Sequence, residues 1–108
     1  MSRFASLKGD AAFRRVKKGR AAKGRFVSVR WRPLRGDEVR VGIVVSKKVG
    51  KAVVRNRVKR RLRELLRRAH LPPSELMVIA RPEAATASFA ELARDLRRTL
   101  IKAGLLSG

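Results

Sequence analysis

The chain has 108 residues, enough for one domain with a modest core, and its 44% hydrophobic content excludes a disordered basic tail. It carries 29 Lys and Arg against 8 Asp and Glu, and the formal net charge of +21 favours a polyanionic partner, with nucleic acid first and an anionic membrane surface second. It has no cysteine, which excludes disulfides and thiolate metal sites.

The first half of the chain is expected to form a short helix and two strands. AAFRRVKKG predicts a helix with Asp10 as N-cap, Gly19 at its end, and Phe13 and Val16 on its apolar side. RFVSVRWRP alternates apolar and polar residues, which predicts a half-buried strand that Pro33 closes. EVRVGIVVS predicts a second strand, apolar on both faces in its second half. The short LRGDE turn between them suggests an antiparallel hairpin.

A long basic helix is expected from about Val53 to His70. At about 100° per residue, its apolar residues gather on one side and most of its cations on the other. Arginines spaced i, i+3, i+4 and i+7 can follow a phosphate backbone, because each guanidinium presents a planar fork of donors. A membrane surface is disfavoured, because lipid would take the apolar face that the sheet needs. LPP stops the helix, and the only histidine, His70, is expected to cap its C-terminal end.

The last part of the chain completes an α+β pattern. ELMVIARP predicts a short buried strand, and the S-x-x-E spacing of Ser88 and Glu91 predicts a capping box that begins the last helix. We therefore expect a single domain over residues 1–108, a two-layer sandwich of three helices on a small sheet of about four strands. The apolar runs are too short to cross a bilayer and the N-terminus lacks the apolar run of a signal peptide, so a cytoplasmic protein is expected.

No pattern typical of a protein active site or metal site is visible. The carboxylates are scattered, without the spacing of a catalytic dyad or a metal cluster. Gly50 and Lys51 are similar to the end of a phosphate-binding P-loop. That motif needs glycine where Val45 stands and Ser or Thr where Ala52 stands, so nucleotide binding is not predicted.

RNA is favoured over DNA as the polyanion. The sequence has no helix-turn-helix and no Cys/His zinc pattern. A sheet that carries a few aromatics and is flanked by basic loops suits single-stranded RNA. Phe13 and Phe26 can stack on bases or fill the core, and the two alternatives have about equal weight.

Residues Arg40 to Glu64 closely resemble the signature of the bacterial ribonuclease P protein family. In that family a strand ending in S-K-K runs through a G-x-A-V loop into a helix that opens R-N-R-x-K-R, and these elements stand here at 46–48, 50–53 and 55–60. LKGDAAFRRVKKG is similar to the family's first helix and MVIARP to its last strand. The resemblance implies a fold like the second domain of ribosomal protein S5. It also implies that strand 39–46, helix 54–69 and strand 76–81 form a left-handed βαβ crossover, against the usual right-handed preference.

The resemblance implies the protein subunit of an RNA enzyme, an endonuclease that removes the 5′ leader of precursor tRNA. The RNA subunit would carry the catalysis with Mg²⁺ that it mainly holds itself, so no catalytic residue and no metal ligand is expected in this chain, and the protein alone is expected to be inactive. The alternative is a structural RNA-binding protein of ribosomal or RNA-chaperone type, which does not account for the RNR segment. A self-sufficient protein nuclease would need clustered carboxylates or a usable histidine.

Two sets of site residues follow from the resemblance and from the charge pattern. The set expected to bind the catalytic RNA is Arg55, Asn56, Arg57, Lys59, Arg60, Arg63 and Arg67. The set expected to bind the leader of precursor tRNA is Phe13, Arg14, Lys17, Lys18, Phe26, Ser46, Lys47 and Lys48. Lys17 stands where many members have a second aromatic, and Val29 where some have tyrosine, so charge is expected to matter more than stacking here.

Overall fold

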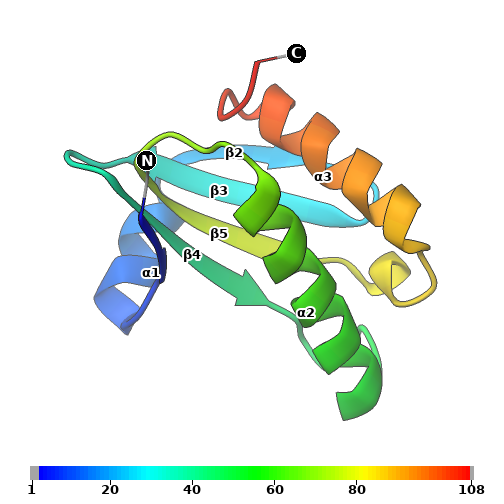
Figure 1. Cartoon of the computed structure of the whole chain (residues 1–108). Coiled ribbons are helices and arrows are strands. Elements are labelled where there is room, and N and C mark those ends of the chain that lie inside the picture. Colours follow the sequence, from blue (N-terminus) through cyan, green and yellow to red (C-terminus); the bar gives the residue numbers. More distant parts are fainter. Residues whose placement is uncertain (1–2, 108) are drawn as a thin grey trace.

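The computed structural model describes residues 3–107, with only the backbone of Arg3, and its described residues form an α+β fold, as expected (Figure 1). One mixed sheet of five strands has the order β1-β4-β5-β3-β2. Its strands are β1 (Arg3–Ser6), β2 (Arg20–Lys23), β3 (Val27–Pro33), β4 (Glu38–Val44) and β5 (Ser74–Ala80). The α-helices are α1 (Asp10–Lys17), α2 (Ala52–Arg68) and α3 (Phe89–Lys102), and a 3₁₀ turn, η1, covers Pro82–Ala85.

The expected hairpin between the strands at 27–33 and 38–46 does not form, because β5 lies between them. β5 runs antiparallel to β3, with Val78 opposite Val29, and parallel to β4, with Leu76 opposite Val41. It is the most apolar strand, and only Ile79 along its length is not fully buried. A strand that is apolar on both faces gains most from the centre of a sheet, whereas β3 carries Arg30 and Arg32 at alternate positions and β4 carries Arg40 in its first half.

Two short edge strands were missed by the sequence prediction, so the sheet has five strands where about four were expected. β1 pairs in parallel with β4, and β2 pairs antiparallel with β3. Their four-residue segments, RFAS and RAAK, lack the β-branched alternation that marks a strand. Their conformation depends on pairing with a longer neighbour more than on their own propensity.

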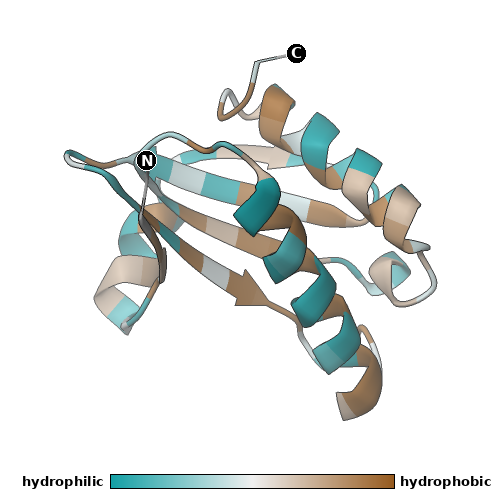
Figure 2. Ribbon diagram, viewed as in Figure 1, coloured by the Kyte–Doolittle hydropathy of each residue, from teal (hydrophilic) through white to brown (hydrophobic). Residues whose placement is uncertain are grey.

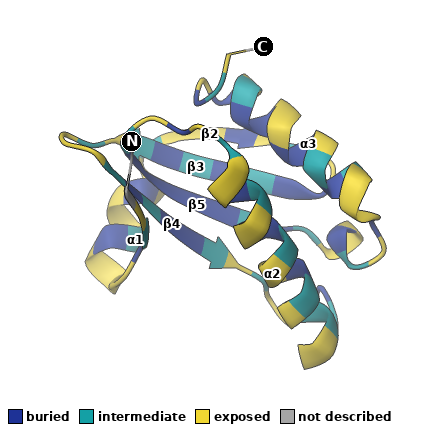
Figure 3. Ribbon diagram, viewed as in Figure 1, coloured by how far each residue is buried: buried dark blue, intermediate teal, exposed yellow. Residues whose placement is uncertain are grey.

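Helices α2 and α3 cover one face of the sheet and enclose the main core (Figure 3). Helix α1 lies on the other face, where Val16 packs on Met77 in a smaller cluster with Leu7 and Ala12. The main core takes alternate residues of the three long strands and the apolar sides of both helices, including Val27, Val29, Trp31, Val41, Leu76, Val78, Val58, Leu62, Leu66, Leu92, Leu96 and Leu100.

The crossover from β4 through α2 to β5 is left-handed. Seen with α2 in front of the sheet and the parallel strands β4 and β5 pointing upward, β5 lies to the left of β4 (Figure 1). The usual right-handed connection would place it to the right. This is the handedness that the family resemblance implied.

The helix ends agree in part with prediction. The capping box of α3 is confirmed: the Glu91 amide donates to Ser88 Oγ at 3.1 Å, and the Ser88 amide donates to Glu91 Oε1 at 2.9 Å. Asp10 is not the N-cap of α1, since Gly9 holds that position and Asp10 lies in the first turn, where the helix dipole favours a carboxylate. His70 does not cap α2 either, because the C-cap is Ala69 and His70 lies exposed beyond it.

A buried carboxylate joins α3 to the turn before β3. Asp95 accepts hydrogen bonds from the backbone amides of Arg25, Phe26 and Val27, at 2.9, 2.8 and 3.1 Å. Gly24 makes this approach possible, because a Cβ there would lie only 2.6 Å from Asp95 Oδ2. The contact fixes the β2–β3 turn against the helix.

Candidate nucleic-acid interface

The division of α2 into an apolar and a basic face is confirmed (Figure 2). Val58, Leu62 and Leu66 are buried against the sheet. Five of the seven residues predicted to bind catalytic RNA are exposed on the opposite side: Asn56, Lys59, Arg60, Arg63 and Arg67. The only carboxylate in the helix, Glu64, pairs with Arg68 at 3.0 Å, so it neutralises none of these five.

The other two predicted residues, Arg55 and Arg57, are half-buried and bound to backbone carbonyls. Arg55 Nε donates to the Gly50 carbonyl at 3.1 Å, and one Arg57 Nη donates to the Ala85 carbonyl at 3.2 Å. These bonds attach the start of α2 to the preceding loop and to η1. Each guanidinium keeps further N–H groups that can meet phosphate.

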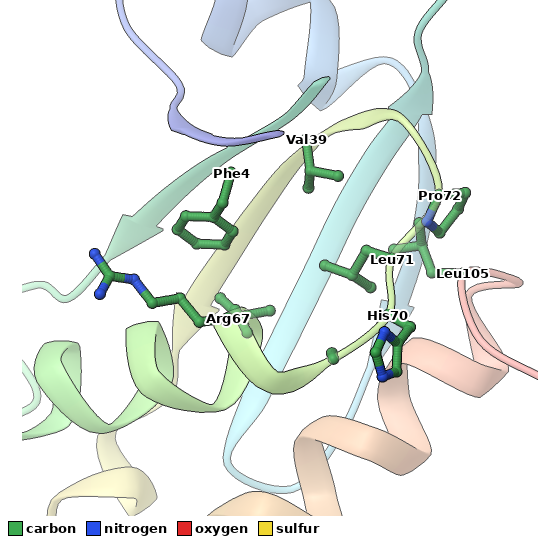
Figure 4. Close-up of a pocket in the computed structure, with 9 residues that line it drawn as sticks. Phe4, Val39, Arg67, His70, Leu71, Pro72 and Leu105 are labelled. Carbon is green, nitrogen blue, oxygen red and sulfur yellow. The ribbon is translucent and has the colours of Figure 1, made fainter. Parts of the chain in front are cut away.

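Arg67 extends the basic face toward the edge strand β1. Its guanidinium carbon lies 5.8 Å from the centroid of the Phe4 ring, a cation–π geometry. Both side chains stand at one end of an apolar groove of about 580 Å³, which His70, Leu71 and Pro72 line at the other end (Figure 4). The cationic row of α2 therefore runs from the loop at Gly50 to β1.

The second predicted set centres on Phe13, on the face of the sheet that carries α1. Phe13 is half-buried, and a Cβ placed on Gly42 would lie 3.0 Å from two carbons of its ring. Glycine at this position of β4 therefore lets the ring lie directly against the strand. One side of the ring packs on the sheet and the rest stays open to a ligand.

An uncovered strip of the sheet continues beyond Phe13. Strand register places Val44, Ile79 and Ser28 side by side, and strand alternation points them to the face of α1. Val44 is 36% exposed, and the other two are half-buried. This shallow strip, apolar in two of its three positions, can accept the faces of unpaired bases.

Cations stand at both ends of this strip. Arg14, Lys17 and Lys18 are exposed on and after α1. Ser46, Lys47 and Lys48 are exposed in the loop after β4. The structure thus places four of the eight residues predicted to bind the leader on or directly after α1, and three more in the loop at the end of β4, next to Val44.

Phe26 does not join this set. It is 7% exposed in the main core, on the side of α3, and the Arg25 guanidinium lies 5.1 Å from its ring centroid. Of the two alternatives left open for Phe26, its position favours the core.

Arg81 is a candidate that the sequence prediction missed. Its backbone is extended, and strand alternation points its side chain to the same face as Ile79. Arg81 Nε is buried without a hydrogen-bond partner among the described residues, and Glu83 Oε2 lies 3.9 Å away. A buried donor atom whose one ionic contact is this long and which makes no hydrogen bond is unusual and suits an anionic ligand. The only signal in the sequence is one arginine directly after an apolar strand.

An ionic cluster holds α1, and with it Phe13, in place. The Glu75 side chain is 0% exposed and pairs with Arg15 of α1 at 3.2 Å, with Arg32 at 2.8 Å and with Arg40 at 3.6 Å. Burial raises the pKa of Glu75, but hydrogen bonds from Arg32 and Arg15 outweigh it, so this pKa lies below its ordinary value. Arg30 adds a bond of 2.8 Å to the carbonyl of Lys17 at the other end of α1.

Residues 3–107 contain no group of three or more His, Cys, Asp or Glu side chains placed to hold a metal ion. None of their helices is both long enough and apolar enough to cross a membrane.

Similar sequences place this chain among known proteins. A family model described as Ribonuclease P matches residues 1–104. The ribonuclease P protein component of Thermus thermophilus is 67% identical over 101 residues, which are 94% of this chain and 61% of that protein. The component of a Nocardioides species is 47% identical and covers 91% of this chain and 90% of its own length. The chain thus spans about three fifths of the length of the Thermus relative.

Solved structures agree with the sequences. The RNase P protein of Staphylococcus aureus has a TM-score of 0.84 with 34% identity, over 93% of this chain and 95% of that chain. The RNase P protein of Thermotoga maritima has a TM-score of 0.80 with 29% identity, over 95% of this chain and 98% of that chain. By family match, identity and fold together, this chain belongs to the ribonuclease P protein family.

Proposed function

We propose that this chain is the protein subunit of a ribonuclease P that removes the 5′ leader of precursor tRNA. The observation that carries the proposal is the placement of two separate cationic surfaces on opposite faces of one sheet. The exposed side of α2 would bind the catalytic RNA, and the strip between Phe13 and the loop at 46–48 would bind the leader. One small domain would then hold substrate and catalyst together.

The chemistry of the reaction is assigned to the RNA subunit. Mg²⁺ can assist hydrolysis of a phosphodiester and prefers oxygen ligands such as carboxylates and phosphates, and an RNA supplies many phosphates. In this proposal Mg²⁺ is held mainly by the RNA, and the protein positions the substrate by charge. The cytoplasmic location also remains a prediction.

Cleavage of a precursor tRNA by a bacterial catalytic RNA at low magnesium, with and without this protein, tests the proposal. We expect strong activation by the protein and no cleavage by the protein alone. Tight RNA binding without activation would instead favour the alternative, a structural RNA-binding protein. Cleavage by the protein alone would overturn the assignment of the chemistry to RNA.

The leader surface has its own test. Phe13→Leu keeps an apolar side chain in the small cluster but removes the ring, so it should weaken binding of a precursor with a leader and leave binding of mature tRNA unchanged. Stacking on an aromatic ring contributes about 1–3 kcal/mol per base. Phe89→Leu is the matched control, since Phe89 is 37% exposed at the start of α3, away from this face. Equal effects of the two changes would contradict the assigned site.

A further inference from the structure

Helix α3 carries a further basic surface that the proposed function does not use. From its second turn onward, every exposed residue of the helix is a cation (Figure 3). These residues are Arg94, Arg97, Arg98 and Lys102. Their spacing of i, i+3, i+4 and i+8 places them on one side of the helix, opposite the buried Leu92 and Leu96.

The charge of this surface is only partly offset within residues 3–107, by Glu91 and Asp95 of the same helix. None of the four cations forms an ion pair with a described carboxylate. Both acids of α3 bind backbone amides instead: Glu91 binds that of Ser88, and Asp95 those of the turn before β3. Like charges at i and i+4, as in Arg94 and Arg98, destabilise an isolated helix. An external anion that covers such a row would remove this repulsion.

The surface continues onto the neighbouring strand and turn. Lys23 and Arg25 are exposed beside α3, and Lys102 Nζ donates to the Lys23 carbonyl at 3.2 Å. A small cleft of about 140 Å³ is lined by three guanidiniums, of Arg25, Arg94 and Arg98, and by the carboxylates of Glu91 and Asp95, which already accept backbone amides. The three guanidiniums outnumber the two carboxylates, and each can offer paired donors to the oxygens of a phosphate group at the mouth of the cleft.

We propose that this α3 surface, formed by Lys23, Arg25, Arg94, Arg97, Arg98 and Lys102, binds the phosphate backbone of a second segment of the catalytic RNA. The inference rests on the proposed function, which supplies the RNA. Helices α2 and α3 lie on the same face of the sheet, so an RNA bound to α2 can reach α3 without crossing the sheet. The leader surface lies on the other face with α1. The protein would then join two segments of one folded RNA.

Neutralising the α3 surface tests the inference. In Arg94→Gln/Arg98→Gln, binding of the catalytic RNA without precursor should weaken about tenfold or more, because two charge-assisted contacts are lost. The slope of log affinity against log salt should become shallower by roughly 1.4, at about 0.7 per single-stranded phosphate contact. The melting temperature of the free double variant should equal or exceed that of the wild type, because repulsion between the two arginines is removed. A fall in melting temperature together with unchanged RNA binding would assign the arginines to stability and overturn the inference.

The matched control is Lys8→Gln/Arg35→Gln, which removes the same charge from exposed positions outside both surfaces. Equal binding by the two double variants would overturn the inference. A loss that appears only when precursor tRNA is present would also overturn it, by assigning α3 to the substrate. The α2 double variant Arg60→Gln/Arg63→Gln, measured alongside, separates the two proposals. If the α2 variant loses RNA binding and the α3 variant does not, only the inference fails. If the wild-type protein does not bind the RNA, the proposed function fails.

Because the chain has no cysteine, RNA segments that bind near α2 and near α3 can be mapped from single introduced cysteines. Single cysteines at Ala52 of α2 and Ala90 of α3, both exposed, can each carry a tethered iron chelate that cuts nearby RNA. The inference expects cuts in two different segments of the catalytic RNA. Cuts from Ala52 alone, or cuts at the same nucleotides from both positions, would contradict a second segment.

Discussion

Asp95 shows how much one residue can contribute to this fold. Its carboxylate accepts three backbone amides in a buried position, and it connects the last helix to the start of β3. In the sequence, Asp95 is one acid beside four cations on the polar side of an amphipathic helix, a pattern typical of an ordinary surface residue. Its role depends on a contact with residues 25–27, about seventy positions earlier, which no local pattern can indicate.

We expect Asp95→Ala to lower the free energy of unfolding by about 3 kcal/mol or more, because three buried amides lose a charged acceptor. Asp95→Asn should lose less, since its side-chain oxygen can still accept. Urea denaturation followed by circular dichroism measures both. Asp37→Ala, in an exposed turn, is the control and should change the value by less than about 0.5 kcal/mol. Similar losses from Asp37 and Asp95 would contradict the role given to Asp95.

The lowered pKa of Glu75 predicts how the free energy of unfolding changes in acid. Its pKa is lower in the folded state than in the unfolded chain, chiefly because hydrogen bonds from Arg32 and Arg15 outweigh the effect of burial. The folded state therefore binds fewer protons at this group. Its contribution to stability is fully present above the ordinary glutamate pKa, about 4.3, and is lost as pH falls through the lower folded value.

We expect Glu75→Gln to flatten the decrease in unfolding free energy between about pH 5 and pH 3. The change should also lower stability at neutral pH, because three arginines lose their shared carboxylate. Urea denaturation at a series of pH values measures both effects. Parallel curves for wild type and variant over this range would show that Glu75 does not titrate as described.

At the scale of an element, α2 uses its arginines in two ways. Arg60 is exposed and, in the described part of the chain, forms no side-chain hydrogen bond or ion pair. Arg57 is bound to the Ala85 carbonyl and so attaches α2 to η1. Sequence spacing predicts that both face RNA, but only the structure separates them.

We expect Arg60→Ala to weaken binding of the catalytic RNA by roughly 1.5–3 kcal/mol without lowering stability. Arg57→Ala should weaken binding and also lower the melting temperature, because the bond to η1 is lost. Filter binding and thermal denaturation of the two variants make the comparison. Identical stability for both would contradict the structural part of the Arg57 role.

Much of each element, though not the pairing, could be predicted from the sequence. The 3.6-residue period of α2 and α3 and the two-residue period of β3 locate their buried faces correctly. The pairing of β3 with β5 could not be predicted, because strand order depends on contacts between distant segments. The α3 surface gives no separate signal in the sequence, because cations opposite an apolar stripe are also typical of an ordinary solvated helix face.

For the molecule as a whole, a charge of +21 opposes compaction of the free protein. Three ion pairs among the described residues converge on Glu75, away from the α2 and α3 surfaces, so few carboxylates offset the charge of those surfaces. An anion that binds only the folded state stabilises it by mass action.

We therefore expect the free protein to be partly unfolded at low salt and to gain helix signal and melting temperature when sulfate is added. Circular dichroism with and without sulfate measures this, and chloride at equal ionic strength is the control for general screening. Sulfate should have the larger effect, because it can be held between several guanidiniums. No response to either salt would contradict an electrostatic limit on folding.

The position of β5 also determines the order in which the protein can assemble. β5 is the last strand along the chain, yet it lies between β4 and β3. Before β5 has been synthesised, only two separate strand pairs can form, β1 with β4 and β2 with β3. No strand of one pair is hydrogen-bonded to a strand of the other. A folding nucleus for the sheet must therefore include residues from both halves of the chain, and such long-range closure is slow. The basic helix α2 thus leaves the ribosome before the sheet that covers its apolar side exists.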